Sequence, residues 1–171
     1  GFIVNENKSK SIPQVILAPL TGKAVLLSEV PDPVFSEKVL GDGVAIIPAD
    51  GKIVSPVDGE ISTVAETSHA YGFTSEDGQE VLVHVGLETV SLNGECFKVY
   101  GKAGDKVKAG DLVAEVDLEY LKEKEINPIT PVLICSDTEG KELQYIEGDV
   151  KAGESEVLVL AEKSGKAEEE K

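Results

Sequence analysis

The sequence predicts an all-β protein, an antiparallel β-sandwich or barrel-sandwich hybrid with one or two short helical turns. Short runs rich in Val, Ile and Leu, which favour strands, follow one another closely along the chain. The 17 glycines and 8 prolines separate these runs, as turn residues do in sandwiches and barrels. No long stretch repeats its apolar residues at the helical period, which excludes a helical bundle.

Nine runs are expected to form the strands. Each combines β-branched or aliphatic residues with a flanking Gly or Pro, or with a polar turn residue. In chain order they are VILAPL (15–20), AVLL (24–27), VAIIP (44–48), KIVSPV (52–57), EISTVAE (60–66), EVLVHVGL (80–87), LVAEVDL (112–118), PVLICS (131–136) and EVLVLAE (156–162).

Helical turns are expected in only two segments. These are PVFSEKV (33–39) and DLEYLKEKEI (117–126). The second segment has apolar residues at positions 118, 121 and 126, which lie on one side of a helix.

A weak internal similarity links GKIVSPVDGEI (51–61) and AGDKVKAGDLVAEV (103–116). Each combines glycine-containing turns with a strand, as happens in barrel-sandwich hybrids such as biotinyl and lipoyl carrier domains. General β-turn chemistry is the favoured explanation of the similarity.

The chain is expected to form one domain over residues 13–162. Residues 1–12 are polar and are expected to be a flexible segment or linker. Residues 163–171 (KSGKAEEEK) are charged and low in complexity and are expected to be a disordered tail. No run of about 18 apolar residues occurs, so no membrane-inserted segment is expected.

The net charge of the chain limits the kinds of partner that it is expected to bind. It carries 16 basic groups, all Lys, and 32 acidic groups. The first twelve residues net +1 and the last nine net zero, so residues 13–162 carry −17. Nucleic-acid binding and anionic membrane surfaces are excluded, because both require clustered positive charge. The charge favours a partner with a basic patch, and the missing Arg removes the bidentate guanidinium from any phosphate chemistry here.

The two cysteines, Cys96 and Cys135, lie far apart and form no CxxC motif. They are interpreted as reduced thiols in the core of a cytoplasmic protein, since secreted folds more often pair their cysteines. No signal segment is present at the start of the sequence.

The two histidines of the chain, His69 and His84, flank a turn signal at residues 75–78 (SEDG). If the hairpin is centred between positions 76 and 77, the two histidines face each other on adjacent antiparallel strands. A bulge at Gly78 would instead shift this register by one residue.

The residues around His84 are consistent with a reactive imidazole. Strand alternation directs Leu82, His84 and Gly86 to one face, and the glycine is expected to leave room beside the ring. Aliphatic neighbours favour the neutral imidazole, which is nucleophilic near pH 7.

Two kinds of chemistry suit such a pair of imidazoles. They could bind zinc with further ligands, or one could carry a phosphoryl group while the other hydrogen-bonds to it. No P-loop sequence is present, so a nucleotide-dependent kinase of that type is excluded.

At these residues the chain resembles the glucose-type enzyme IIA family of the bacterial phosphoenolpyruvate-dependent sugar phosphotransferase system, over residues 13–162. The segment GQEVLVHVGLETV (78–90) fits the family's active-site pattern. Further matches are VPDPVFSEKVLGDGVAI (30–46), SPVDGEI (55–61), ETSHA (66–70) and LNGECF (92–97).

The resemblance implies a phosphohistidine relay with no required cofactor. His84 would take a phosphoryl group at Nε2 from the phosphocarrier protein HPr and pass it to a cysteine of a sugar-specific enzyme IIB domain. His69 would stabilise the phosphoryl group and assist its onward transfer, and Thr67 would hydrogen-bond within the site. The residues expected to dock the partners are Asp32, Val34, Phe35, Gly86, Glu88 and Val90.

Glu88 departs from a frequent aspartate in the family but keeps its charge. A basic HPr would supply the arginine that this chain lacks. The protein would be cytoplasmic, either free or tethered as a domain of a larger permease, and nothing in the sequence names the sugar.

The sequence leaves three alternative functions open. A regulatory module, binding transporters or metabolic enzymes according to phosphorylation, is compatible with the relay. A biotinyl or lipoyl carrier would need a lysine in an MKM or DKA hairpin, and neither occurs. A zinc peptidase of related fold would need more histidines, although His69 and His84 could hold zinc at an interface.

Overall fold

The computed structural model describes residues 14–136 and 138–162. The expected N-terminal linker (1–12) and charged tail (163–171) lie outside the described residues. In the described part, no helix combines the length and the apolar character needed to cross a membrane.

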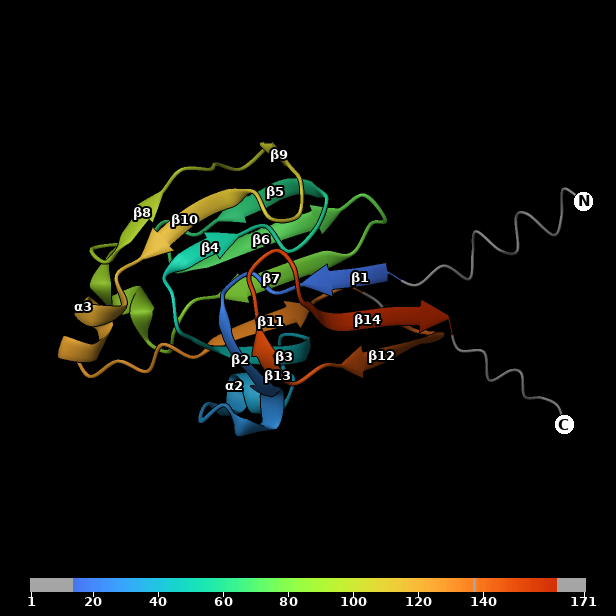
Figure 1. The fold of residues 1–171 in the computed structure, drawn as a ribbon, viewed down its shortest axis with the longest axis horizontal. Helices are drawn as coiled ribbons and strands as arrows, with labels where there is room; N and C mark the ends of the chain where they lie inside the picture. Colours follow the sequence, from blue (N-terminus) through green and yellow to red (C-terminus); the bar gives the residue numbers. More distant parts are fainter. Residues whose placement is uncertain (1–13, 137, 163–171) are drawn as a thin grey trace, which may run out of the picture.

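The expected all-β architecture is confirmed. Fourteen strands and a few short helical segments make up the described chain (Figure 1). In order they are β1 (Gln14–Leu17), β2 (Gly22–Leu26), η1 (Leu27–Glu29), α2 (Pro33–Ser36), β3 (Asp42–Pro48), β4 (Lys52–Val54), β5 (Gly59–Val64), β6 (Ala70–Ser75), β7 (Glu80–His84), η2 (Thr89–Leu92), β8 (Phe97–Val99), β9 (Lys106–Val107), β10 (Leu112–Val116), α3 (Leu118–Glu123), β11 (Thr130–Ile134), β12 (Lys141–Tyr145), β13 (Gly148–Val150) and β14 (Glu156–Glu162).

All nine predicted runs contain a strand, and both predicted helical turns are present as α2 and α3. Strands β8, β9, β12 and β13 were not predicted, because they are short or carry few consecutive aliphatic residues. Strand β6 was expected only as the partner of β7 in the histidine hairpin.

The strands form three antiparallel sheets. The largest has the order β13-β2-β3-β11-β7-β6-β5-β9, and two three-stranded sheets have the orders β1-β14-β12 and β4-β10-β8. The two segments with the weak internal similarity lie against each other, since β4 pairs with β10 and β5 pairs with β9.

The middle of the large sheet is buried on both faces. Alternate residues of each central strand enter different clusters: Val83 and Val132 join the main core, whereas Leu82 and Leu133 join a second, smaller cluster. Because both faces exclude water, the middle of each of these strands is a run of consecutive aliphatic residues.

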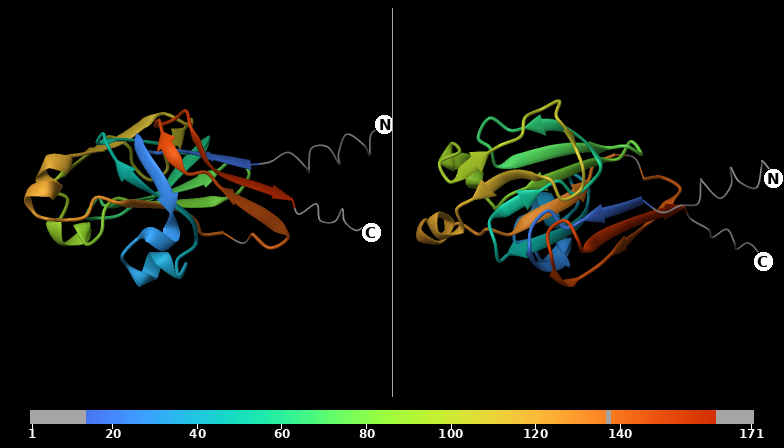
Figure 2. Two further views of the ribbon diagram at one scale, coloured as in Figure 1. Left: turned by 60° about the horizontal axis from the view of Figure 1, so that its bottom comes forward. Right: turned by 45° about the horizontal axis from the view of Figure 1, so that its top comes forward.

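The smaller cluster lies under η1 and α2, which project from one face of the large sheet (Figure 2). Its members are Val25, Leu27, Val30, Phe35, Ala45, Leu87, Ile129 and Leu133, with Leu82 packed against them. His84 follows Leu82 on the same face of β7, so the fold places this imidazole at the edge of the smaller cluster.

The cysteine interpretation is correct for Cys96 and wrong for Cys135. Both thiols are free, but only Cys96 is buried. Cys135 directly follows the last residue of β11 and is exposed where the chain leaves the sheet. The apolar run in the sequence thus extends to Cys135, one residue beyond the end of β11, where the side chain is no longer buried.

Candidate functional site

The β6–β7 hairpin brings the two histidines together in a register shifted by one from the predicted one. His84 lies opposite Ala70, not opposite His69. The cause is Gly78, which closes the turn with φ +89°, so that three residues form the loop.

The two imidazoles nevertheless meet. His69 precedes the first residue of β6, and its carbonyl oxygen accepts a hydrogen bond from the Val85 N–H (2.7 Å). Since His69 lies outside the strand, the pleat of β6 does not dictate the direction of its ring. The ring centroids of His69 and His84 are 4.9 Å apart with the planes nearly perpendicular.

The proton position on His84 follows from its hydrogen bond. Nδ1 lies 2.9 Å from the carbonyl oxygen of Gly86, which can only accept, so Nδ1 carries the proton. In the neutral ring, Nε2 then holds the free electron pair. The geometry therefore agrees with Nε2 as the nucleophilic atom.

The ring of His69 is held by a hydrogen bond to Thr67. Its Nδ1 and the Thr67 hydroxyl are hydrogen-bonded at 2.5 Å. The chain turns sharply between them at Ser68, which has φ +62°. When the hydroxyl donates this bond, the proton of the neutral imidazole sits on Nε2, which can then donate to an anion.

Burial favours the neutral form of both rings. It lowers the pKa of His69 below its usual value. Burial also lowers the pKa of His84, and the neighbouring His69 lowers it further, against the opposing effects of the Gly86 carbonyl and the Asp32 carboxylate. Both shifts favour the uncharged imidazole, the form in which a ring nitrogen can attack phosphorus.

Asp32, at the N-terminal cap of α2, and Phe35, within α2, both lie near His84. Asp32 caps the helix, since its Oδ1 accepts from the Val34 N–H (3.0 Å). The Phe35 and His84 ring centroids are 4.9 Å apart.

Phe35 is 4% exposed, so it is not the surface residue that the resemblance suggested. One helical turn directs Val34 outward, 42% exposed, and Phe35 inward onto the smaller cluster. The Phe35 ring thus packs against the His84 ring, and Val34 is the residue of this turn that is exposed for contact with a partner.

The expected role of Gly86 also needs correction. A Cβ atom at Gly86 would lie 2.6 Å from Thr89 Cγ2 and 3.2 Å from the Asn127 carbonyl oxygen, and Gly86 has φ +79°. The glycine is thus required by a left-handed turn packed against protein, rather than by room for an approaching group. Beyond this turn Glu88 and Val90 are exposed, as expected for contact residues.

Three residues near the site were missed from the sequence. Thr89 is buried, and its hydroxyl donates to the Val85 carbonyl (2.6 Å), which closes the turn that carries Gly86. Val39 and Leu40, just after α2, are 67% and 45% exposed. Val39 is the last residue of the predicted helical segment (33–39) and Leu40 follows it, so the available signal was a pair of aliphatic residues at an expected helix end.

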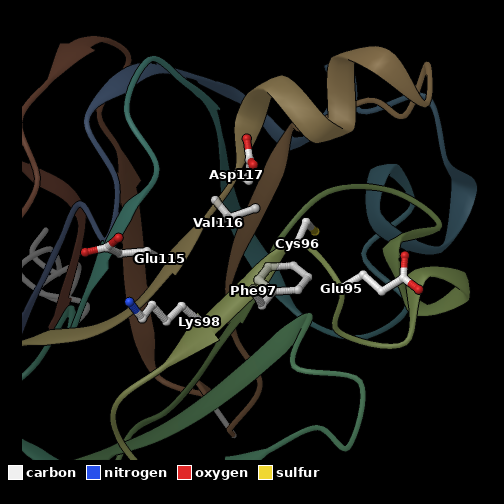
Figure 3. Close-up of a pocket in the computed structure, with 7 residues that line it drawn as sticks. All are labelled: Glu95, Cys96, Phe97, Lys98, Glu115, Val116 and Asp117. Atoms are coloured by element: carbon white, nitrogen blue, oxygen red, sulfur yellow. The ribbon is translucent and has the colours of Figure 1, made fainter.

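A pocket of about 370 Å³ over β8 and β10 contains none of these residues (Figure 3). Its side chains diverge: Lys98 and Glu115 lie toward one end and Asp117 near α3. Asp117 caps α3 by accepting from the Tyr120 N–H, and Glu95 accepts from the Tyr120 hydroxyl. These polar groups are engaged in holding α3, so the histidine pair remains the candidate site.

Metal binding has limited support from this chain. No group of three or more His, Cys, Asp or Glu side chains with metal-binding geometry occurs among residues 14–136 and 138–162. His69 and His84 could offer two nitrogens, half of the tetrahedral set that zinc takes. Their Nδ1 atoms are already hydrogen-bonded, which is typical of zinc-binding histidines.

A β-sandwich that holds a neutral imidazole pair with one nucleophilic nitrogen at its surface has the features of a phosphotransferase relay protein. The family described as "phosphoenolpyruvate-dependent sugar phosphotransferase system, EIIA 1" matches residues 14–139. The chain belongs to this family of phosphocarriers in sugar uptake, which confirms the resemblance seen in the sequence.

Similar proteins cover nearly the whole chain. The "PTS system glucose-specific EIIA component" of Oceanobacillus iheyensis is 42% identical over 92% of this chain and 94% of that protein. The glucose permease IIA from Mycoplasma capricolum, a solved structure, has a TM-score of 0.80 and 36% identity, covering 86% of this chain and 96% of the other.

Some relatives are longer. The "PTS system glucosamine-specific EIICBA component" of Bacillus subtilis is 46% identical over 78% of this chain, which corresponds to 21% of that protein. EIIA domains of this family thus occur both alone and joined to other components of the system.

Proposed function

We propose that this protein carries a phosphoryl group on Nε2 of His84 between the phosphocarrier HPr and an enzyme IIB domain of a glucose-type permease. The observation that carries the proposal is the Nδ1–H bond to the Gly86 carbonyl, which leaves Nε2 of a neutral imidazole as the nucleophile. Glucose as the sugar is supported by the names of the relatives.

In the first step the phosphorus–nitrogen bond of phospho-HPr breaks as a bond to Nε2 of His84 forms. In the second step that bond breaks as a phosphorus–sulfur bond forms on enzyme IIB. His69 faces the reacting ring, so its Nε2 proton can hydrogen-bond to the phosphoryl oxygens. Thr67 holds His69 in that orientation. The chain has no Arg, so the partner would supply the cation that stabilises the transferring group.

Both partners would use the same surface, here called the docking face and defined by Asp32, Val34, Val39, Leu40, Glu88 and Val90. It combines exposed aliphatic side chains with two carboxylates: Asp32, which acts electrostatically on His84, and Glu88, which follows His84 closely in the sequence. Apolar contacts can exclude water from the reaction while the acids attract a basic partner. Regulated transporters or metabolic enzymes, and zinc shared with such a partner at His69 and His84, remain predictions for this same surface.

Labelling tests the proposed function. The protein is incubated with phosphoenolpyruvate, enzyme I and HPr, and the acid-labile phosphate is mapped by mass spectrometry. We expect one phosphoryl group on His84, formed only when all three reagents are present. Phosphate at another residue, or none, contradicts the proposal and favours a binding module without transfer.

Neutralising the docking face is expected to slow association with HPr. The double variant Asp32→Asn, Glu88→Gln should lower the association rate constant about 3- to 10-fold at low salt and flatten its salt dependence, because electrostatic steering is lost. Asn retains the helix cap at position 32.

The matched control is Glu156→Gln, Glu162→Gln, which removes the same charge from exposed positions on β14. Stopped-flow measurements over a salt series give the rates. Equal slowing in both double variants would assign the effect to net charge rather than to the docking face.

A further inference from the structure

Three side chains from distant parts of the chain meet beside the docking face. The Tyr145 hydroxyl donates to Asp42 Oδ2 (2.5 Å), and Lys38 Nζ lies 3.3 Å from Asp42 Oδ1. Lys38 Nζ also lies 5.6 Å from the centroid of the Tyr145 ring. Lys38, Asp42 and Tyr145, here called the clasp, therefore contact one another in all three pairs.

The clasp connects two sheets. Asp42 begins β3 in the eight-stranded sheet, whereas Tyr145 ends β12 in the β1-β14-β12 sheet. Their hydrogen bond spans 103 residues of sequence. A pocket of about 190 Å³ lies beneath them, lined by Leu26, Leu27, Ser28, Lys38, Gly43 and Tyr145.

The segment that carries the exposed residues Val39 and Leu40 lies between two members of the clasp. Lys38 and Asp42 lie immediately before and after residues 39–41, so their contact closes this segment into a short loop. Lys38 has φ +62°, a conformation that a lysine adopts only at a cost in free energy. A backbone in this region persists when its surroundings hold it, and the clasp is such a support.

The loop is also tied to the helix of the site. The Val39 N–H donates to the Val34 carbonyl oxygen (3.1 Å), and the Lys38 N–H to that of Phe35 (3.0 Å). Val34 belongs to the docking face, and the Phe35 ring lies against His84. The clasp thus adjoins the docking face through backbone hydrogen bonds but does not touch either imidazole.

The ion pair alone would hold the loop weakly. The side chains of Lys38 and Asp42 are 52% and 34% exposed, and exposed pairs contribute little because water screens them. The Tyr145 hydroxyl adds a charge-assisted hydrogen bond to the same carboxylate, and its ring adds a contact with the ammonium group. Tyr145 therefore adds two further contacts to the ion pair.

We propose that Tyr145 is a positioning residue for partner docking: through Asp42 and Lys38 it holds residues 38–41 in the conformation that presents Val39 and Leu40 to the phosphorylated carrier protein. This inference rests on the proposed function. It assigns Tyr145 no part in the chemistry at His84. A surface ordered before binding needs no ordering during binding, so loss of the clasp weakens docking without altering the reacting groups.

Tyr145→Phe tests the inference, because it removes the hydroxyl and keeps the ring. Transfer from phospho-HPr to the variant should show KM raised about 3- to 10-fold with kcat unchanged, as expected when docking alone is weakened. Phosphorylation by phosphoramidate, a donor without a docking surface, should keep the wild-type rate. Tyr100→Phe, at an exposed tyrosine just after β8, is the matched control and should leave KM unchanged.

A second measurement separates positioning from general stability. Val39→Ser removes an apolar contact from the same loop, so its effect on KM and that of Tyr145→Phe should be less than additive in the double variant. Additive effects, an unchanged KM in Tyr145→Phe, or an equal loss with phosphoramidate would each overturn the inference. If the wild-type protein accepts no phosphoryl group from phospho-HPr, the proposed function itself fails and this inference fails with it.

Discussion

Replacing His84 by Gln is expected to abolish phosphorylation by phospho-HPr. The Gln amide nitrogen has no available electron pair, so the variant lacks the atom that attacks phosphorus. Its amide group can still donate to the Gly86 carbonyl, which in the native protein accepts from His84 Nδ1. The side chain is only half-buried, and we expect the fold to be retained.

The measurement is incorporation of acid-labile phosphate after incubation with phosphoenolpyruvate, enzyme I and HPr. Unchanged circular dichroism and an unchanged association constant for unphosphorylated HPr are the controls, because they show that folding and docking survive. Stoichiometric phosphate on the His84→Gln protein would contradict the assignment of the nucleophile.

Replacing His69 by Gln is expected to slow donation of the phosphoryl group to enzyme IIB but not its acceptance from phospho-HPr. Acceptance from phospho-HPr should continue, because the variant retains Nε2 of His84 and the hydrogen bond from His84 Nδ1 to the Gly86 carbonyl. Donation to enzyme IIB should fall about 100- to 1000-fold, the size of effect seen when one positioned donor to a developing charge is removed.

Single-turnover transfer from the isolated phosphoprotein to enzyme IIB measures the second step alone. Thr67→Val is the companion variant, since it keeps His69 but removes the hydroxyl that holds its Nδ1. It should show a smaller loss in the same step. If His69→Gln slowed acceptance and donation equally, His69 would act as a general part of the site rather than in onward transfer.

The secondary structure was predictable wherever a strand is buried on both faces. The runs that became β3, β7 and β11 each contain at least three consecutive aliphatic residues, because their alternate side chains enter two different clusters. Strands β9 and β12 were missed because their side chains are mostly half-buried or exposed, so no apolar periodicity marks them.

The site was predictable as a pair of histidines around a turn, but its details were not. The register shifted because Gly78 adopts a positive φ, which adds one residue to the loop. The predicted contact surfaces of Phe35 and Gly86 are buried, since a helical turn and a left-handed turn direct them inward. Such orientations depend on what lies next to each turn in space.

The sequence by itself therefore determined the fold class, the strands of the central sheet, the hairpin that carries His69 and His84, and the acidic charge of the body. These features depend on residues close together in the sequence, since turn residues and the alternation of side chains along a strand involve only a few neighbouring positions. Only the tertiary structure decided that Phe35 supports His84, that Cys135 is exposed, and that Tyr145 reaches Asp42 across 103 residues. Those contacts depend on how three sheets pack, because a side chain far along the chain becomes a neighbour only when the core brings it there.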